Sequence, residues 1–222
     1  MKKLEILILA VLFFFVILGV YFARMNLGYF VDVYTREDGL IESLTALALL
    51  CAGLVCVFRV WRMKGLRTKT FLACCGILGV VALFGAGEEI SWGQRILGFN
   101  SPKFFQQNNS QLETNLHNIV VGGVKLNKLI FGKLLAIGVV LYIIVLPVLY
   151  HRSARFRGWL DSLGVPIARP CQILCVVALF AMLAMMPSKK KSEVMEFGGC
   201  TIFLLILAYP RNAGIFDPRQ PR

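Results

Sequence analysis

The sequence predicts an all-α protein, a polytopic membrane helix bundle with about six transmembrane helices. Hydrophobic residues make up 58% of the 222 residues, charged residues only 16%, and the mean hydropathy is +0.72. A soluble core of this size cannot enclose so many apolar side chains. The apolar stretches are continuous and do not alternate with polar residues, which favours membrane helices over the strands of a barrel.

Six stretches reach or approach the roughly 20 apolar residues that a helix needs to cross a bilayer. No internal repeat or long linker separates them, so residues 1–222 are expected to form a single integral membrane domain. The last stretch is the shortest, and its boundaries are the least defined by the pattern. The predicted spans are residues 4–22, 40–59, 70–90, 130–150, 168–187 and 194–209.

The first predicted span follows a basic start, Met-Lys-Lys, of the kind that also begins secretory signals. Its apolar region of about 17 residues is longer than the usual signal core, and no small-x-small cleavage site follows it. We expect a retained first helix, with a cleaved signal as the alternative.

The seven cysteines all lie within the apolar stretches. In such surroundings they act as small hydrophobic side chains. Their spacing shows no Cys-x-x-Cys or Cys/His pattern for zinc, and it implies no disulfide.

Basic residues predict the orientation, because cytoplasmic loops of membrane proteins carry an excess of lysine and arginine. With both termini cytoplasmic, that face holds Lys2, Lys3 and the basic clusters at residues 59–69 and 152–157. Almost all of the formal net charge of +12 then lies on the cytoplasmic face of the membrane. Attraction to anionic lipid explains the basic character of the chain, so no nucleic-acid partner is needed.

Acidic residues and a histidine stand at the ends of the predicted spans. Because successive spans run in opposite directions, all of these ends lie at the same membrane face. This holds whichever face is the outer one. A carboxylate in hydrocarbon costs several kcal/mol, whereas one at the headgroups costs far less. We therefore predict one cavity near a membrane face that is lined by Glu42, Glu88 or Glu89, Arg95, His117 and Glu196.

The motif GEEISWGQR follows the third predicted span. If the helix continues through it, Glu88, Ser91 and Arg95 share one face, and Glu89 points about 100° away. One interpretation is a structural ion-pair network with Trp92 as an interfacial anchor. The other is an active site in which Glu88 or Glu89 is a base or metal ligand and Arg95 binds an anionic group.

The largest polar stretch, residues 100–118, ends in the motif QLETNLHN. A helical turn here would place Glu113 and His117 at i and i+4, a spacing compatible with a metal-ligand pair or an acid/base pair. His117 as a simple capping or hydrogen-bonding group is the alternative. The same loop is a candidate surface for a protein partner.

The acidic set also makes a divalent metal a candidate cofactor, and carboxylates with one histidine suit Mg, Mn, Fe or Zn. Glu193 and Glu196 share a helix face, and Gly198 and Gly199 are expected to permit close helix approach. The candidate metal ligands are Glu42, Glu89, Glu113, His117 and Glu196.

Three motifs, REDGLIESLTAL, GEEISWGQRILGF and NLHN, occur in this order between apolar stretches. They resemble the signatures of a family of uncharacterised multi-pass bacterial membrane proteins, over most of the chain. That resemblance implies the fold and an inner-membrane setting, but no established activity. A remoter analogy is to alkaline-ceramidase-like membrane hydrolases, which use several histidines; this chain departs from them, with only His117 and His151.

Three function classes remain open. The first is a membrane-embedded enzyme acting on a lipid or lipid-linked headgroup at the outer face, and we expect this class. Its catalytic residues would be Glu88, Glu89, Arg95 and His117. The second is a noncatalytic membrane subunit that binds a protein partner. The third is a proton-coupled transporter, although the polar residues lie at span ends and not near the bilayer midplane.

Overall fold

The computed structural model describes residues 2–116, 118–121, 124–125 and 135–219. Within these ranges the regular secondary structure is helical apart from one pair of two-residue antiparallel strands, β1 (Val120–Val121) and β2 (Val124–Lys125). The predicted all-α class is confirmed. The longer helices are α1 (Lys3–Met25), α3 (Leu40–Met63), α4 (Lys69–Glu89), α10 (Pro170–Ala184) and α11 (Lys191–Ala208).

Shorter elements connect these helices. A broken apolar helix consists of α7 (Leu135–Val140), the π-helical turn η4 (Leu141–Val145) and α8 (Leu146–Arg152). The others are α2 (Leu27–Tyr29), η1 (Phe30–Tyr34), η2 (Ser91–Gly93), α5 (Gln94–Leu97), α6 (Lys103–Asn108), α9 (Ala154–Ser162) and η5 (Ala213–Phe216).

Three helices in the described part of the chain are long and apolar enough to cross a membrane, namely α1, α3 and α4. Residues 138–152 and α10 form shorter apolar helices. Helix α11 is 18 residues long but carries three charged side chains near its start. The structure is therefore compatible with a membrane protein. The prediction of six spans stays a prediction, and part of the fourth, residues 130–150, lies outside the described residues.

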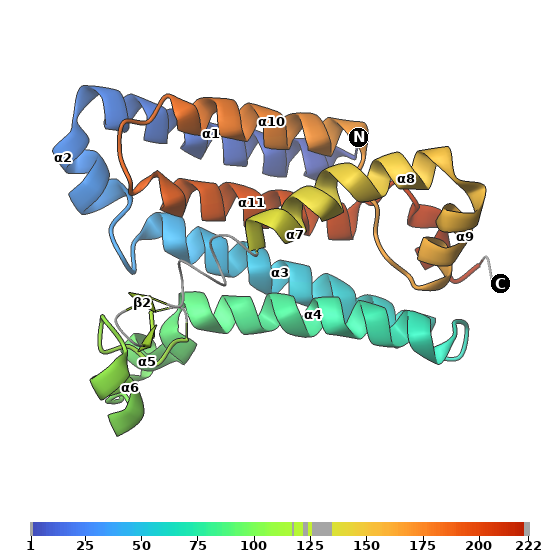
Figure 1. Ribbon diagram of the computed structural model, residues 1–222, viewed down its shortest axis with the longest axis horizontal. Coiled ribbons are helices and arrows are strands. Elements are labelled where there is room, and N and C mark those ends of the chain that lie inside the picture. Colours follow the sequence, from blue (N-terminus) through green and yellow to red (C-terminus); the bar gives the residue numbers. More distant parts are fainter. Residues whose placement is uncertain (1, 117, 122–123, 126–134, 220–222) are drawn as a thin grey trace.

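The long helices run back and forth, so that the two termini lie at the same end (Figure 1). Helices α1 and α10 run parallel to each other. Arg169 pairs with Glu5 where the two helices start, and Arg24 Nε donates to the Met185 carbonyl at 2.6 Å where they end. Helices α3 and α11 are also parallel, and Arg59 near the end of α3 donates to the Ala208 carbonyl at 3.4 Å. We call residues 2–5, 59–69, 150–169 and 208–219 the terminal end. Residues 35–42, 86–119 and 185–196 form the loop end.

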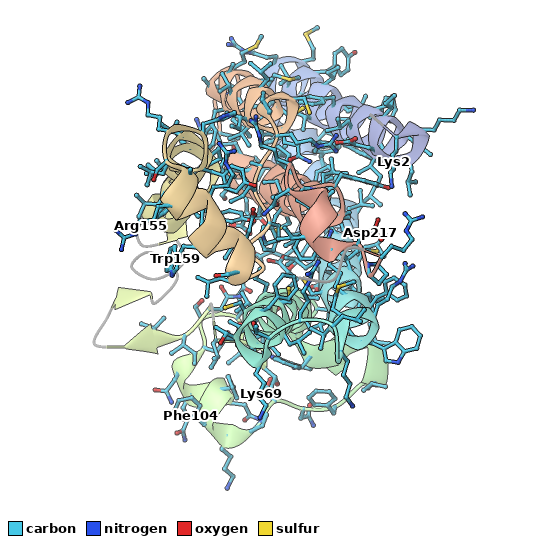
Figure 2. All side chains as sticks on the ribbon, turned by 90° about the vertical axis from the view of Figure 1, so that its right-hand side faces the viewer. Lys2, Lys69, Phe104, Arg155, Trp159 and Asp217 are labelled. Carbon is cyan, nitrogen blue, oxygen red and sulfur yellow. The ribbon has the colours of Figure 1, made fainter. Side chains whose placement is uncertain are left out.

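Helix α11 lies in the middle of the bundle, between α1 and α10 on one side and α3 and α4 on the other (Figures 1 and 2). Its Ile202, Leu205, Ile206 and Leu207 are fully buried. By contrast, α4 exposes Ile77, Val80 and Val81, and comparable apolar side chains are exposed on the outer helices. An apolar outer surface of this kind is what a helix bundle presents to lipid.

Glycines bring two pairs of helices close together. A Cβ atom on Gly53 of α3 would lie 2.5 Å from Leu83 of α4, and one on Gly198 of α11 would lie 2.5 Å from Leu179 of α10. Side chains at these positions would force the helices apart. The prediction for Gly198 is confirmed, whereas Gly199 faces open space and makes no such contact.

Candidate functional site

The chain turns sharply immediately after α4. The helix ends at Glu89, and Ser91, Trp92 and Gly93 have φ angles of 46°, 54° and 78°. Three consecutive residues with positive φ cannot continue a right-handed helix. The predicted continuation through GEEISWGQR is therefore wrong, and the expected common face of Glu88, Ser91 and Arg95 does not form.

The Trp92 ring folds back over the last turn of α4. A Cβ atom on Gly87 would lie 2.9 Å from this ring, so glycine leaves the space that the indole occupies. The Trp92 Nε1–H donates to Glu88 Oε1 at 2.8 Å, and the ring packs edge-on against Phe84. This contact holds the reversed chain against the helix.

Glu88 is buried, with 5% of its surface exposed, and it joins the helix end to the segment that follows. Its other carboxylate oxygen accepts the backbone N–H of Leu116 at 2.6 Å. A buried carboxylate needs such donors to offset the loss of water. Glu88 thus fastens residues 91–119, which we call the polar loop, onto the end of α4.

Inside the polar loop, Glu113 is the centre of a second hydrogen-bond network. Its Oε2 accepts from Asn115 Nδ2 at 2.7 Å, Ser91 Oγ at 3.1 Å and Asn118 Nδ2 at 3.4 Å. Asn109 Oδ1 accepts the backbone N–H of Glu113 at 3.2 Å. Side-chain acceptors that bind the backbone in this way compete with helix formation.

The helical turn predicted for QLETNLHN is therefore wrong in the residues that the structure describes there. Leu112 has a φ of 61°, and residues 111–116 are bends and turns. His117 lies outside the described residues, so its predicted pairing with Glu113 is untested. The same holds for the side chain of Arg95, whose backbone lies on α5.

A group of carboxylates from three helices meets at the loop end, next to the polar loop. We call Glu42 of α3, Glu89 of α4, and Glu193 and Glu196 of α11 the acidic cluster. Glu89 interacts electrostatically with the other three, and Glu42 interacts with Glu193. Glu196 is exposed and the others are half-buried. The structure thus brings together the predicted residues Glu42, Glu89 and Glu196, with Glu88 and Glu113 adjoining them.

Lys190 contributes a positive charge to this region, which the sequence reasoning missed. Its Nζ lies 3.0 Å from Glu37 Oε1, and it interacts with the charges of Glu42 and Glu193. Burial on its own lowers the pKa of Lys190, but the hydrogen bond to Glu37 and the nearby carboxylates outweigh burial and raise the pKa above the ordinary lysine value. The sequence feature that could have identified Lys190 is its position directly before the acidic start of α11.

The described residues contain no group of three His, Cys, Asp or Glu side chains arranged to hold a metal ion. Glu113 accepts hydrogen bonds from Ser91 and Asn115 within the polar loop. The set Glu42, Glu89, Glu113, His117 and Glu196 stays a prediction, because His117 is not among the residues described.

The site therefore combines two different carboxylate environments. Glu88 and Glu113 accept several hydrogen bonds and shape the polar loop, whereas the acidic cluster gathers like charges from helices far apart in the sequence. Such a cluster can accept and release protons or attract a cation. Comparison of the chain with protein families, with curated proteins and with solved structures finds no match in any of the three.

Proposed function

We propose that this protein is a membrane-embedded enzyme that acts on a lipid or lipid-linked headgroup, with the loop end as its active end. The observation that carries the proposal is the meeting of Glu42, Glu89, Glu193 and Glu196 beside a folded polar loop. Like charges held close together destabilise the folded state. We therefore infer that the cluster is retained because it serves the function of the protein.

The acidic cluster lies at the ends of helices proposed to span the membrane, which is the depth at which a lipid headgroup would be bound. Glu42 lies in the first turn of α3 and Glu89 is the last residue of α4, and both helices are long enough to span a bilayer. Side chains at span ends lie near the headgroups, where lipid phosphates and their substituents are found. A transporter site would instead be expected near the midplane.

The two adjacent glutamates take different roles in this proposal. Glu89 is the proton-transfer group, because its neighbours are the other carboxylates of the cluster. Glu88 positions the polar loop through Trp92 and Leu116. His117 remains the proposed second acid/base group and Arg95 the proposed anion-binding group.

The proposed setting is the bacterial inner membrane, with six spans, both termini cytoplasmic and the loop end outside. The concentration of lysine and arginine at the terminal end supports this orientation. Reporter fusions ending at Asn108 should report the outside, and fusions ending at Lys64 or Arg155 the inside. A cytoplasmic signal at Asn108 would invert the orientation while leaving the acidic cluster at one face.

A noncatalytic membrane subunit is the second candidate, and one observation favours it. The polar loop exposes Ile96, Leu97 and Phe104, which project from α5 and α6. Figure 1 shows these two helices on the far side of α4 from α11. An apolar patch of this kind suits a protein partner.

The enzyme proposal is tested by comparing membrane lipids from cells that overproduce the protein or its variants. The wild-type chain should change the amount of at least one headgroup class, and Glu89→Gln should abolish that change while the protein remains inserted. Asp32→Asn is the matched control, because it also removes one carboxylate and Asp32 is exposed on η1. Identical lipid profiles with and without the wild-type protein would refute the enzyme. Copurification of a stoichiometric protein, lost in Leu97→Glu, would favour the subunit.

A further inference from the structure

A groove of about 360 Å³ lies between α10 and α11 at the loop end. Its walls include Phe180 and Leu183 of α10 and Met195 of α11, and its mouth includes Lys189, Lys191 and Ser192. The acidic cluster does not line this groove. It is a separate feature that the proposed enzyme chemistry does not use.

The groove is polar at the helix ends and apolar farther along the helices. A membrane leaflet changes in the same order, from polar headgroups to apolar hydrocarbon. Lys189 follows the end of α10 at Ala184, and Lys191 begins α11, so the basic side chains lie at the helix ends. Met195 lies about one helical turn inside α11, and Phe180 lies one turn inside α10. The mouth is therefore at headgroup depth and the apolar walls extend toward the hydrocarbon.

The charge at the mouth is positive. Lys189 and Lys191 line it, whereas Lys190 between them is turned to Glu37 at 3.0 Å. Arg24 lies at the adjoining end of α1, where its Nε donates to the Met185 carbonyl in the turn after α10. Basic residues on a non-cytoplasmic face run against the usual charge distribution of membrane proteins, so a binding role accounts for them better than topology does.

We propose that this groove binds one anionic phospholipid, with the phosphate between Lys189 and Lys191 and an acyl chain against Phe180, Leu183 and Met195. Lysine ammonium groups are donors suited to a phosphate diester. Aliphatic and aromatic walls suit the chain, since burying each CH₂ group contributes about 0.8 kcal/mol. The proposal requires a membrane setting but does not require the protein to be an enzyme.

The test uses the full-length protein in detergent, titrated with phosphatidylglycerol and followed by native mass spectrometry. The double variant Lys189→Gln/Lys191→Gln should weaken binding by about 10-fold or more, because each lysine near a membrane surface contributes about 1 kcal/mol toward anionic lipid. The matched control is Arg36→Gln/Lys103→Gln. It removes the same two charges from exposed positions at the loop end and should change the affinity less than 2-fold.

The groove wall is tested separately with Met195→Trp, whose larger side chain fills the space. This variant should weaken phosphatidylglycerol binding several-fold, and soluble glycerol 1-phosphate should fail to displace the lipid at comparable concentrations. Thermal denaturation in detergent checks that each variant is folded. An equal loss in the control pair would mean general charge attraction only, and effective competition by glycerol 1-phosphate would mean an anion site without a chain. Either result would overturn the lipid site, and neither bears on the lipid-profile test of Glu89→Gln.

Discussion

Glu5 and Asp161 at the terminal end of the bundle and the acidic cluster at the loop end differ in the partners of their carboxylates. At the terminal end, fully buried Glu5 accepts from Arg169, and buried Asp161 accepts from the Tyr150 hydroxyl at 3.2 Å and from Asn212 Nδ2 at 2.9 Å. At the loop end, Glu89 is surrounded by other carboxylates. A carboxylate paired with a cation or with hydrogen-bond donors is stabilised, although Glu5 Oε2 itself has no hydrogen-bond partner among the residues that the structure describes, whereas carboxylates grouped with one another repel. The paired acids connect elements at the terminal end, whereas the acidic cluster is the feature on which the proposed function rests.

The terminal end also connects segments that are distant in sequence. Arg169 Nε donates to the Tyr209 carbonyl at 2.7 Å, and Asn212 Oδ1 accepts the Ile167 N–H at 3.0 Å. Gln172, fully buried, donates to the Leu205 carbonyl at 3.0 Å. These bonds tie the start of α10 to the end of α11. In Figure 2 this end faces the viewer, with Lys2 and Arg155 extending away from the bundle.

The largest loss of stability is expected from breaking the pair of Glu5 and Arg169 at the terminal end. Arg169→Met leaves Glu5 buried without its cation, and removing one partner of a buried pair costs about 3–5 kcal/mol. Thermal denaturation of the purified protein in detergent should show a large loss of stability. The double variant Glu5→Leu/Arg169→Met should recover most of it. An equal loss in the double variant would mean that packing, and not the pair, stabilises this end.

A smaller and local effect is expected from Trp92→Phe. It removes the hydrogen bond to Glu88 but keeps an aromatic ring over Gly87, and a hydrogen bond to a charged group contributes about 1.5–3 kcal/mol. Amide hydrogen exchange should speed up in residues 91–119 and stay unchanged in α10 and α11. Faster exchange throughout the bundle would show that the polar loop and the bundle unfold together.

Removing a carboxylate from the acidic cluster should have the opposite effect on the stability of the protein. Glu89→Gln keeps the shape of the side chain and removes repulsion from Glu42, Glu193 and Glu196, so the melting temperature in detergent should rise or stay constant while function is lost. Glu5→Gln, the control at the terminal end, should lower the melting temperature, because its carboxylate is paired with Arg169. A destabilised Glu89→Gln protein would make the cluster a structural network.

The smallest effect concerns the pair of Lys190 and Glu37, whose side chains are 33% and 47% exposed. Lys190→Gln should cost about 0–1 kcal/mol, as is usual for surface ion pairs. Because the pKa of Lys190 is raised, this contribution is present at neutral pH and is lost as the pH rises past the ordinary lysine range. The difference in stability between wild type and variant should therefore be larger in melting curves at pH 7 than in those at pH 11.

The sequence predicted the gathering of Glu42, Glu89 and Glu196 because that outcome follows from alternating helices alone. It did not predict the reversal at Ser91 and Trp92. Non-glycine residues there adopt positive φ, and the contacts of Trp92 with Gly87 and Glu88 that hold them are set by tertiary structure. The irregular course of residues 111–116 escaped prediction for a similar reason, since amide side chains occupy backbone groups that a helix would use.

The separation between Glu5 and Arg169 has a consequence for how the protein is made. Helix α1 leaves the ribosome first, yet the cation that pairs with its carboxylate is encoded 164 residues later. At synthesis rates of roughly 5–20 residues per second, Glu5 waits about 10 to 30 s for its partner. During that interval Glu5 has no Arg169 to pair with, so the final packing of the start of α1 into the bundle is a late event in the biogenesis of the chain.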